Sequence, residues 1–138
     1  MKQQIEVPGD WDSIATLMAF SDSVEACLPL SADQSYLMRL VIEEIATNIV
    51  KYGYSDANRD VIQLTCLVER DTLHLTIRDR GTPFDPSAHP DPDLSSTDPA
   101  IREPGGLGLF FVRELADQLS YHHDPTSGWN ELTVIKGR

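Results

Sequence analysis

Hydrophobic positions recur at helical spacing in two early segments of the chain. Between residues 12 and 28 they lie three or four residues apart, which predicts a first helix that ends before Pro29. Ser31, followed three residues later by Gln34, forms the capping-box pattern that begins many helices. A second helix is therefore expected over about residues 32–52.

Alternation of apolar and polar residues, the pattern of a half-buried strand, occurs in the middle of the chain and near its end. A turn around Arg70 and Asp71 joins two of these runs into a hairpin. A short edge strand is expected to stop at Pro8, because proline cannot donate to a strand ladder. The expected strands lie near residues 5–8, 61–68, 73–77, 119–122 and 130–136.

The order of these elements indicates the fold class. Residues 85–104 are rich in proline, aspartate and serine, which predicts a long irregular loop of the kind that usually has a function. A third helix is expected from Gly105 to about Leu119. We therefore predict an α/β (α+β) two-layer sandwich, with a mixed, largely antiparallel sheet and helices on one face. The length of 138 residues, 41% of them hydrophobic, suits one domain over residues 1–138.

The net charge narrows the classes of partner, and the cysteine content indicates the cellular compartment. A formal net charge of −11 would repel a phosphate backbone or an anionic membrane, so we expect neither a nucleic acid nor a membrane as partner. Neither of the two cysteines has the spacing of a metal or redox motif, which fits a reducing compartment. The first residues lack an apolar leader region, and a cytoplasmic protein is expected.

Two polar residues interrupt the apolar stripe of the second predicted helix. Glu44 and Asn48 share this stripe, and burying them is costly unless something polar meets them. Because they are four residues apart, both can point at one object: a carboxylate can take a proton from a hydroxyl, and an amide oxygen can bind Mg²⁺. Alternatively, Glu44 is solvated or pairs with Lys51. Glu43 lies on the more polar side and is the weaker candidate for a base.

A third polar interruption lies at the end of the predicted hairpin. Asp79 continues the apolar row of its strand and therefore needs a hydrogen-bond donor. An adenine amino group is a suitable donor, because a purine also stacks against apolar walls. Gly81 would let the backbone approach the ring, and Pro83 would stiffen the exit. The alternative is a turn aspartate that accepts hydrogen bonds from nearby backbone N–H groups.

A glycine-rich segment stands between the irregular loop and the third predicted helix. Gly105-Gly106-Leu107-Gly108-Leu109 would expose backbone N–H groups at the positive end of a helix, an arrangement that binds phosphate. It matches neither a Walker A motif nor a dinucleotide fingerprint, and a hinge or tight turn is the alternative. A base with a metal ligand, an adenine acceptor and a phosphate loop can together converge on ATP and Mg²⁺.

These motifs resemble those of the GHKL superfamily, whose Bergerat-type ATP site is shared by histidine kinases and type II topoisomerases. Residues 44–48 resemble its N box, residues 79–84 its first glycine box and residues 105–109 its second. The small size and the Asp-x-Gly-x-Pro-Phe form most resemble the anti-sigma factor serine/threonine kinases of partner-switching systems. The resemblance implies ATP and Mg²⁺ as cofactors, with Glu44 as the general base and Asn48 as the Mg²⁺ ligand.

The resemblance also implies roles for other candidate residues. Asp79 and Gly81 would hold the adenine, and residues 85–104 would form a lid over the phosphates. Arg102 in this lid would reach the γ-phosphate, unless it is a solvated loop arginine. The nucleotide contacts implied in this way are Asn48, Lys51, Asp79, Gly81, Arg102, Gly105, Gly106, Leu107, Gly108 and Thr133.

Two of these positions have an open alternative. Lys51 stands where the resembled family often has a histidine, so its contact with the phosphates is in question. Thr133, in a family-like position on the last expected strand, would assist adenine binding through a water molecule. An ordinary strand threonine would give the same sequence.

The function implied by this resemblance is that of an ATP-dependent protein serine/threonine kinase. Such a protein phosphorylates a STAS-domain antagonist and binds a sigma factor or another effector, and homodimers are common among the resembled kinases. The alternative is a nucleotide-dependent binding module without phosphotransfer. A detached sensor histidine kinase core is disfavoured, because the chain has no room for a dimerisation helix pair. His122 and His123 are interpreted as part of a surface turn and not as a metal site.

Overall fold

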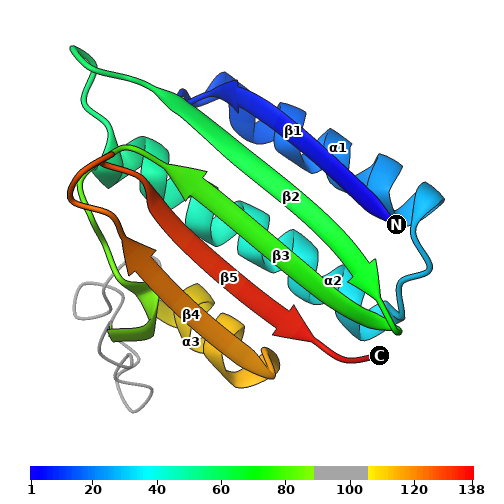
Figure 1. The fold of residues 1–138 in the computed structure, drawn as a ribbon. Coiled ribbons are helices and arrows are strands. Elements are labelled where there is room, and N and C mark those ends of the chain that lie inside the picture. The colour runs from blue at the N-terminus through cyan, green and yellow to red at the C-terminus, as the bar shows by residue number, and fades with distance from the viewer. Residues whose placement is uncertain (89–105) are drawn as a thin grey trace, which may run out of the picture.

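The computed structural model describes residues 1–88 and 106–138, which form a sheet layer and a helix layer (Figure 1). The strands are β1 (Lys2–Pro8), β2 (Val61–Glu69), β3 (Thr72–Asp79), β4 (Gln118–His123) and β5 (Asn130–Lys136). The helices are α1 (Asp12–Cys27), α2 (Ala32–Val41) and α3 (Gly106–Leu115). Figure 1 shows all three helices on the same face of the sheet. The predicted two-layer α/β sandwich is therefore confirmed.

The five strands are arranged in the order β1-β2-β3-β5-β4, and all four pairings are antiparallel. β1 lies at one edge and ends at Pro8, as its sequence predicts. In the turn between β2 and β3, Arg70 and Asp71 have φ values of 52° and 63°. Two consecutive positive φ angles characterise the type I′ turn, whose twist matches that of a hairpin. This turn places Leu73 opposite Val68 and Asp79 opposite Ile62.

Alternate residues of the central strands form the core with the helices. Burial alternates along β2 and β3, and every second side chain faces the helix layer. Asp79 occupies the last buried position of β3 and is only 7% exposed. On β5 the buried positions are Asn130, Leu132 and Val134, so Thr133 lies on the opposite, helix-free face.

The start of α2 is fixed to the sheet by the predicted capping box. Ser31 Oγ accepts a hydrogen bond from the Gln34 N–H at 3.2 Å, and Gln34 Oε1 accepts one from the Ser31 N–H at 3.0 Å. The buried Gln34 amide also donates to the carbonyl oxygens of Asp71 and Lys136, each at 2.9 Å. These bonds connect the helix start to the β2–β3 turn and to the end of β5.

The second helix continues beyond α2 to Gly53, close to the predicted end at residue 52. It contains two π-helical segments, η1 (Ile42–Ala46) and η2 (Ile49–Gly53). Glu44 lies inside the first of them and Asn48 lies between them. The regular α-helical step assumed from the sequence is therefore not followed where the candidate residues lie. Such π segments frequently occur at functional sites.

The third helix is shorter than predicted. It ends at Leu115 instead of continuing to about Leu119, because the chain already pairs with β5 at Asp117, whose N–H donates to the Ile135 carbonyl at 2.9 Å. β4 accordingly begins at Gln118. The predicted loop begins with a short 3-10 turn, η3 (Pro86–Ala88), and residues 89–105 lie outside the described part of the chain. Among the described residues, no helix is sufficiently long and apolar to cross a membrane.

Candidate nucleotide-binding site

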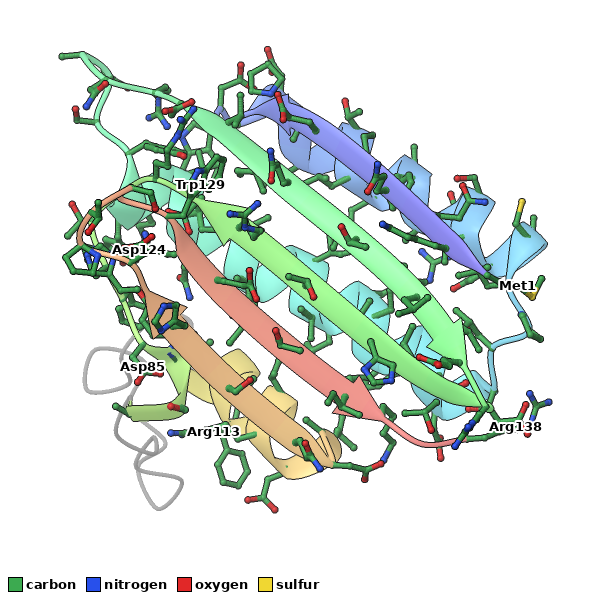
Figure 2. The ribbon with its side chains drawn as sticks, in the orientation of Figure 1. Met1, Asp85, Arg113, Asp124, Trp129 and Arg138 are labelled. Carbon is green, nitrogen blue, oxygen red and sulfur yellow. The ribbon has the colours of Figure 1, made fainter. Side chains whose placement is uncertain are left out.

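A pocket of ≈ 420 Å³, part of it open to solvent, lies between the second helix and the adjoining ends of β3 and β5. Asp124 and Trp129, in the turn that leads into β5, mark this end of the sheet (Figure 2). The apolar part of the wall consists of Ile45, Ile49, Ile77, Phe84, Pro86 and Leu132. The rest of the wall consists of Asn48, Gly53, Asp79, Thr82, Tyr121 and Asn130. Apolar walls with a few convergent polar groups suit a flat heteroaromatic ligand.

Asp79 presents one free carboxylate oxygen in this pocket. Its Oδ2 accepts hydrogen bonds from the Gly81 N–H at 2.9 Å and from Asn130 Nδ2 at 3.2 Å. Its Oδ1 accepts no hydrogen bond from residues 1–88 or 106–138. The alternative of a turn aspartate therefore accounts for one oxygen, and the other remains available to a ligand donor.

Burial makes the charge of Asp79 costly. Desolvation raises the pKa of Asp79, and this effect exceeds the opposing effects of the Gly81 N–H, the Asn130 amide and the nearby His123. A buried acid with a raised pKa in a pocket is a candidate for a functional group. A donor from a bound ligand would compensate for part of the lost hydration.

Gly81 is required by a close approach of two backbone segments. A Cβ atom at this position would lie 2.5 Å from the Gly53 carbonyl oxygen and 3.0 Å from Asp79 Oδ2. The same carbonyl accepts the Thr82 N–H at 2.8 Å, which attaches the end of the second helix to the segment after β3. Gly81 thus lies directly beside the Asp79 carboxylate, as its sequence position suggested.

Asn130, which the sequence analysis did not single out, lies at the centre of a hydrogen-bond network. It is 3% exposed and donates to Asp79 Oδ2 and, at 2.9 Å, to the Gly81 carbonyl. Its Oδ1 accepts from the Tyr121 hydroxyl at 3.1 Å and lies 2.6 Å from His123 Nδ1. The signal was present in the sequence, because Asn130 continues the buried row of β5 just as Asp79 continues that of β3.

Glu44 and Asn48 take different places at the pocket. Asn48 lines it, whereas the half-buried Glu44 lies beside α3, where a Cβ atom on Gly108 would collide with the Glu44 carboxylate. Burial raises the pKa of Glu44, and the negative charge of the exposed Glu43 raises it further. The structure gives Glu44 no ion pair with Lys51 among the described residues, so the pairing with Lys51 does not apply, whereas the half-buried carboxylate stays partly accessible to solvent.

The remaining candidates are not all brought to the pocket. Lys51 is exposed, and its Nζ lies 5.0 Å from the centre of the Tyr52 ring. Thr133 faces the helix-free side of the sheet between Thr76 and Ser120, so the structure favours an ordinary strand threonine.

The glycine-rich segment is described from Gly106 onward. Gly106, Leu107 and Gly108 form the first turn of α3, and Leu107 is 37% exposed. Gly105 and Arg102 lie outside the described residues, as does most of the predicted lid.

The pair of histidines proves to be strand and not turn. His122 and His123 end β4, and His123 contacts Asn130 at the pocket. In the described part of the chain, no cluster of three or more histidine, cysteine, aspartate or glutamate side chains is arranged to hold a metal ion.

Comparison with known proteins gives the family. Residues 7–136 match the model of the histidine kinase-like ATPase domain. The chain belongs to this family. This membership confirms the resemblance to the GHKL superfamily, fits the Bergerat-type architecture and implies that this histidine kinase-like ATPase domain binds ATP.

Curated relatives of this ATPase domain include protein kinases and an anti-sigma factor. Serine/threonine-protein kinase BtrW of Bordetella bronchiseptica is 34% identical over 105 residues, 75% of this chain and 71% of BtrW. An anti-sigma F factor of Anoxybacillus flavithermus is 26% identical over 121 residues, 88% of this chain and 77% of the relative. Serine-protein kinase RsbW of Listeria monocytogenes is 28% identical over 90 residues, 63% of this chain and 57% of the relative. These names support a kinase-type activity.

Proposed function

We propose that this chain is an ATP-dependent protein serine/threonine kinase, one domain over residues 1–138, whose adenine site is the pocket around Asp79. The observation that supports this most is the free Oδ1 of a buried carboxylate inside an apolar-walled pocket of an ATPase domain. The adenine ring would lie between the isoleucines of the second helix and Leu132, with its amino group donating to Asp79 Oδ1.

The triphosphate is proposed to extend from this pocket toward Asn48 and the start of α3. Asn48 belongs to the pocket wall, and the first turn of α3 provides backbone N–H groups at the positive end of a helix. A Mg²⁺ ion bound by the Asn48 side-chain oxygen and the phosphates would supply charge neutralisation and orientation. Arg102 and Gly105 are retained as proposed phosphate contacts.

Glu44 is proposed as the general base. Its half-buried carboxylate has a pKa raised by burial, which makes it a stronger base than an exposed glutamate. It would accept the proton of a serine or threonine hydroxyl while the hydroxyl oxygen forms a bond to the γ-phosphorus. The bond from the γ-phosphorus to the bridging oxygen breaks at the same centre, and ADP leaves.

The protein partners are proposed from the relatives. One relative is named an anti-sigma factor and others are named serine-protein kinases, so we propose a partner switch. In it, the chain phosphorylates a STAS-domain antagonist in the cytoplasm and binds a sigma factor or another effector. The net charge of −11 favours a partner with a basic surface.

Transfer of labelled phosphate tests this function. The native protein is incubated with γ-labelled ATP, Mg²⁺ and a STAS-domain protein purified from the same organism, in parallel with Glu44→Ala. Phosphate on a serine or threonine of the STAS protein, formed only by the native chain, is expected. Equal nucleotide-dependent binding of the partner by both proteins without any transfer would contradict the kinase and support a binding module.

A further inference from the structure

The amide of Asn130 is the only group of β5 that contacts Asp79 through a side-chain hydrogen bond in the described structure. Both of its N–H bonds are used, one toward Asp79 Oδ2 and one toward the Gly81 carbonyl. Its oxygen faces two groups of β4, the Tyr121 hydroxyl and His123 Nδ1. All hydrogen-bonding capacity of this buried side chain is therefore directed at the surroundings of Asp79.

We propose that Asn130 is the positioning residue that makes the pocket selective for 6-aminopurines, because it holds Asp79 with one oxygen engaged and the other directed to the ligand. This inference rests on the proposed function, since it takes the pocket around Asp79 as an adenine site.

The two acceptors beside the Asn130 amide, Asp79 Oδ2 and the Gly81 carbonyl, fix its orientation. If the amide were rotated by half a turn, its oxygen would face Asp79 Oδ2 and the Gly81 carbonyl, two acceptors. Its NH₂ group would then face the Tyr121 hydroxyl and His123. In the observed orientation the oxygen only accepts, so the 2.6 Å contact requires a proton on His123 Nδ1. Tyr121 and His123 thereby support the hydrogen bond from the Asn130 amide to Asp79 Oδ2, which we call the Asn130 clamp.

The clamp determines which purine edge is accepted. With Oδ2 engaged by Gly81 and Asn130, the free Oδ1 acts as an acceptor and matches the amino group of adenine. A purine with a carbonyl at the same position would place two acceptors together, which is strongly disfavoured in a buried site. Without the amide, the carboxyl can rotate or take up a proton, and a protonated carboxyl can donate to a purine carbonyl.

The charged state of Asp79 depends on the same contacts. Within residues 1–88 and 106–138, the groups that face it are His123 and Tyr121 from β4, Asn130 from β5, the Gly81 N–H and Tyr54 after the second helix. Burial raises the pKa of Asp79, and the amide of Asn130 opposes this rise. Removing the amide should raise this pKa further, so the ionised acceptor would be lost at a higher pH.

The test compares binding of ATP and inosine triphosphate, whose base has a carbonyl in place of the amino group. Both are titrated with Mg²⁺ at several pH values against the native protein, Asn130→Ala and Thr133→Ala. Thr133 is the matched control, because it lies on the same strand but on the opposite face. Circular dichroism confirms that each variant is folded.

The native protein and Thr133→Ala are expected to bind ATP more tightly than inosine triphosphate, with the same ratio of the two affinities. In Asn130→Ala the preference should fall about five-fold, the effect of one hydrogen bond of ordinary strength. The loss of ATP binding on acidification should also move to higher pH. If Asn130→Ala fails to fold, Tyr121→Phe removes one support of the amide and should lower the preference about two-fold.

An unchanged ratio of the two affinities and an unchanged pH profile in Asn130→Ala, or in Tyr121→Phe if it replaces that variant, would overturn the clamp. Such a result would leave the proposed function intact. Failure of the native protein to bind either nucleotide would overturn both proposals, so the two failures are distinguishable.

Discussion

At the scale of single residues, the site consists of polar side chains in positions where the fold buries side chains. Asp79 and Asn130 each continue a buried row of a strand, and Glu44 is half-buried beside α3. Burial raises the pKa of both acids, so their ionised forms reduce the stability of the fold. Polar groups kept at such a cost are typical of functional sites.

The pH dependence of phosphotransfer tests the role of Glu44. A base acts only when ionised, so activity should be present above the raised pKa of Glu44 and be lost as the pH falls through it. Glu43→Gln removes the like charge that contributes to this rise, so the acid limb of the rate profile should move to lower pH. A limb that stays in place in Glu43→Gln, or phosphotransfer with the native limb in Glu44→Gln, would contradict Glu44 as the base.

Gly108 offers a second test at this scale. In Gly108→Ala the new methyl group would displace the Glu44 carboxylate, so phosphotransfer should fall about 100-fold, the typical contribution of a positioned base. ATP binding, measured by calorimetry, should change much less, because alanine keeps the backbone N–H through which Gly108 is proposed to contact the phosphates. Gly137→Ala is the matched control, because its new Cβ would lie 3.3 Å from only the flexible Asp117 side chain. Equal activity of the two variants would show that Glu44 need not occupy its observed position.

At the scale of elements, the second helix connects stability with function. Its first turn is fixed by Ser31 and Gln34, and its last turns present Asn48 to the pocket. The start and the site lie at opposite ends of the same helix. A change at the start should therefore alter stability without altering the chemistry of the site.

Gln34→Ala should lower the free energy of unfolding by about 2–3 kcal/mol, because the Asp71 and Lys136 carbonyls lose the donor from this buried amide and the Ser31 N–H loses its acceptor. Ser31→Ala loses only the cap and should cost about 1 kcal/mol. Urea denaturation measures both values. A smaller loss for Gln34→Ala than for Ser31→Ala would contradict the proposed link between the helix start and the sheet.

The sequence could predict the elements to the extent that periodicity determines them. Alternation gave the hairpin of β2 and β3 with its buried faces, and the capping box gave the start of α2. The π segments could not be predicted, because the spacing of apolar residues indicates a helix but does not distinguish its hydrogen-bond pattern. The same holds for the end of α3, which depends on the pairing of Asp117 with β5.

The candidate site could be predicted only where its contacts join residues that are close in the sequence. Asp79 and Gly81 are neighbours in sequence, so their contact followed from a local motif. The contacts of Asn130 with Asp79 and Tyr121 span 51 and 9 residues and depend on strand order, which one sequence does not reveal. Thr133 was assigned by family-like position alone, and the register of β5 places it on the other face.

At the scale of the whole molecule, nucleotide binding should stabilise the fold. The pocket joins the helix layer to β3 and β5, so a bound ligand connects parts that separate on unfolding. At a free ATP concentration about 100 times the dissociation constant, the free energy of unfolding should rise by about 2.7 kcal/mol. Denaturation with and without ATP and Mg²⁺ measures this rise. An unchanged midpoint at millimolar ATP would contradict the proposed pocket.

The central claim is that the free oxygen of Asp79 receives the amino group of adenine, and a change of acceptor to donor tests it most directly. In Asp79→Asn, the side-chain oxygen must face the Gly81 N–H and the Asn130 amide, so the new NH₂ group would face the ligand.

Calorimetric titration of both proteins with ATP and with inosine triphosphate, each with Mg²⁺, is the decisive measurement. The native protein is expected to bind ATP more tightly than inosine triphosphate. Asp79→Asn should lose at least about ten-fold in affinity for ATP, and its affinity for inosine triphosphate relative to ATP should rise. Equal affinity of the two proteins for ATP, or no uptake of ATP by the native protein, would contradict the account.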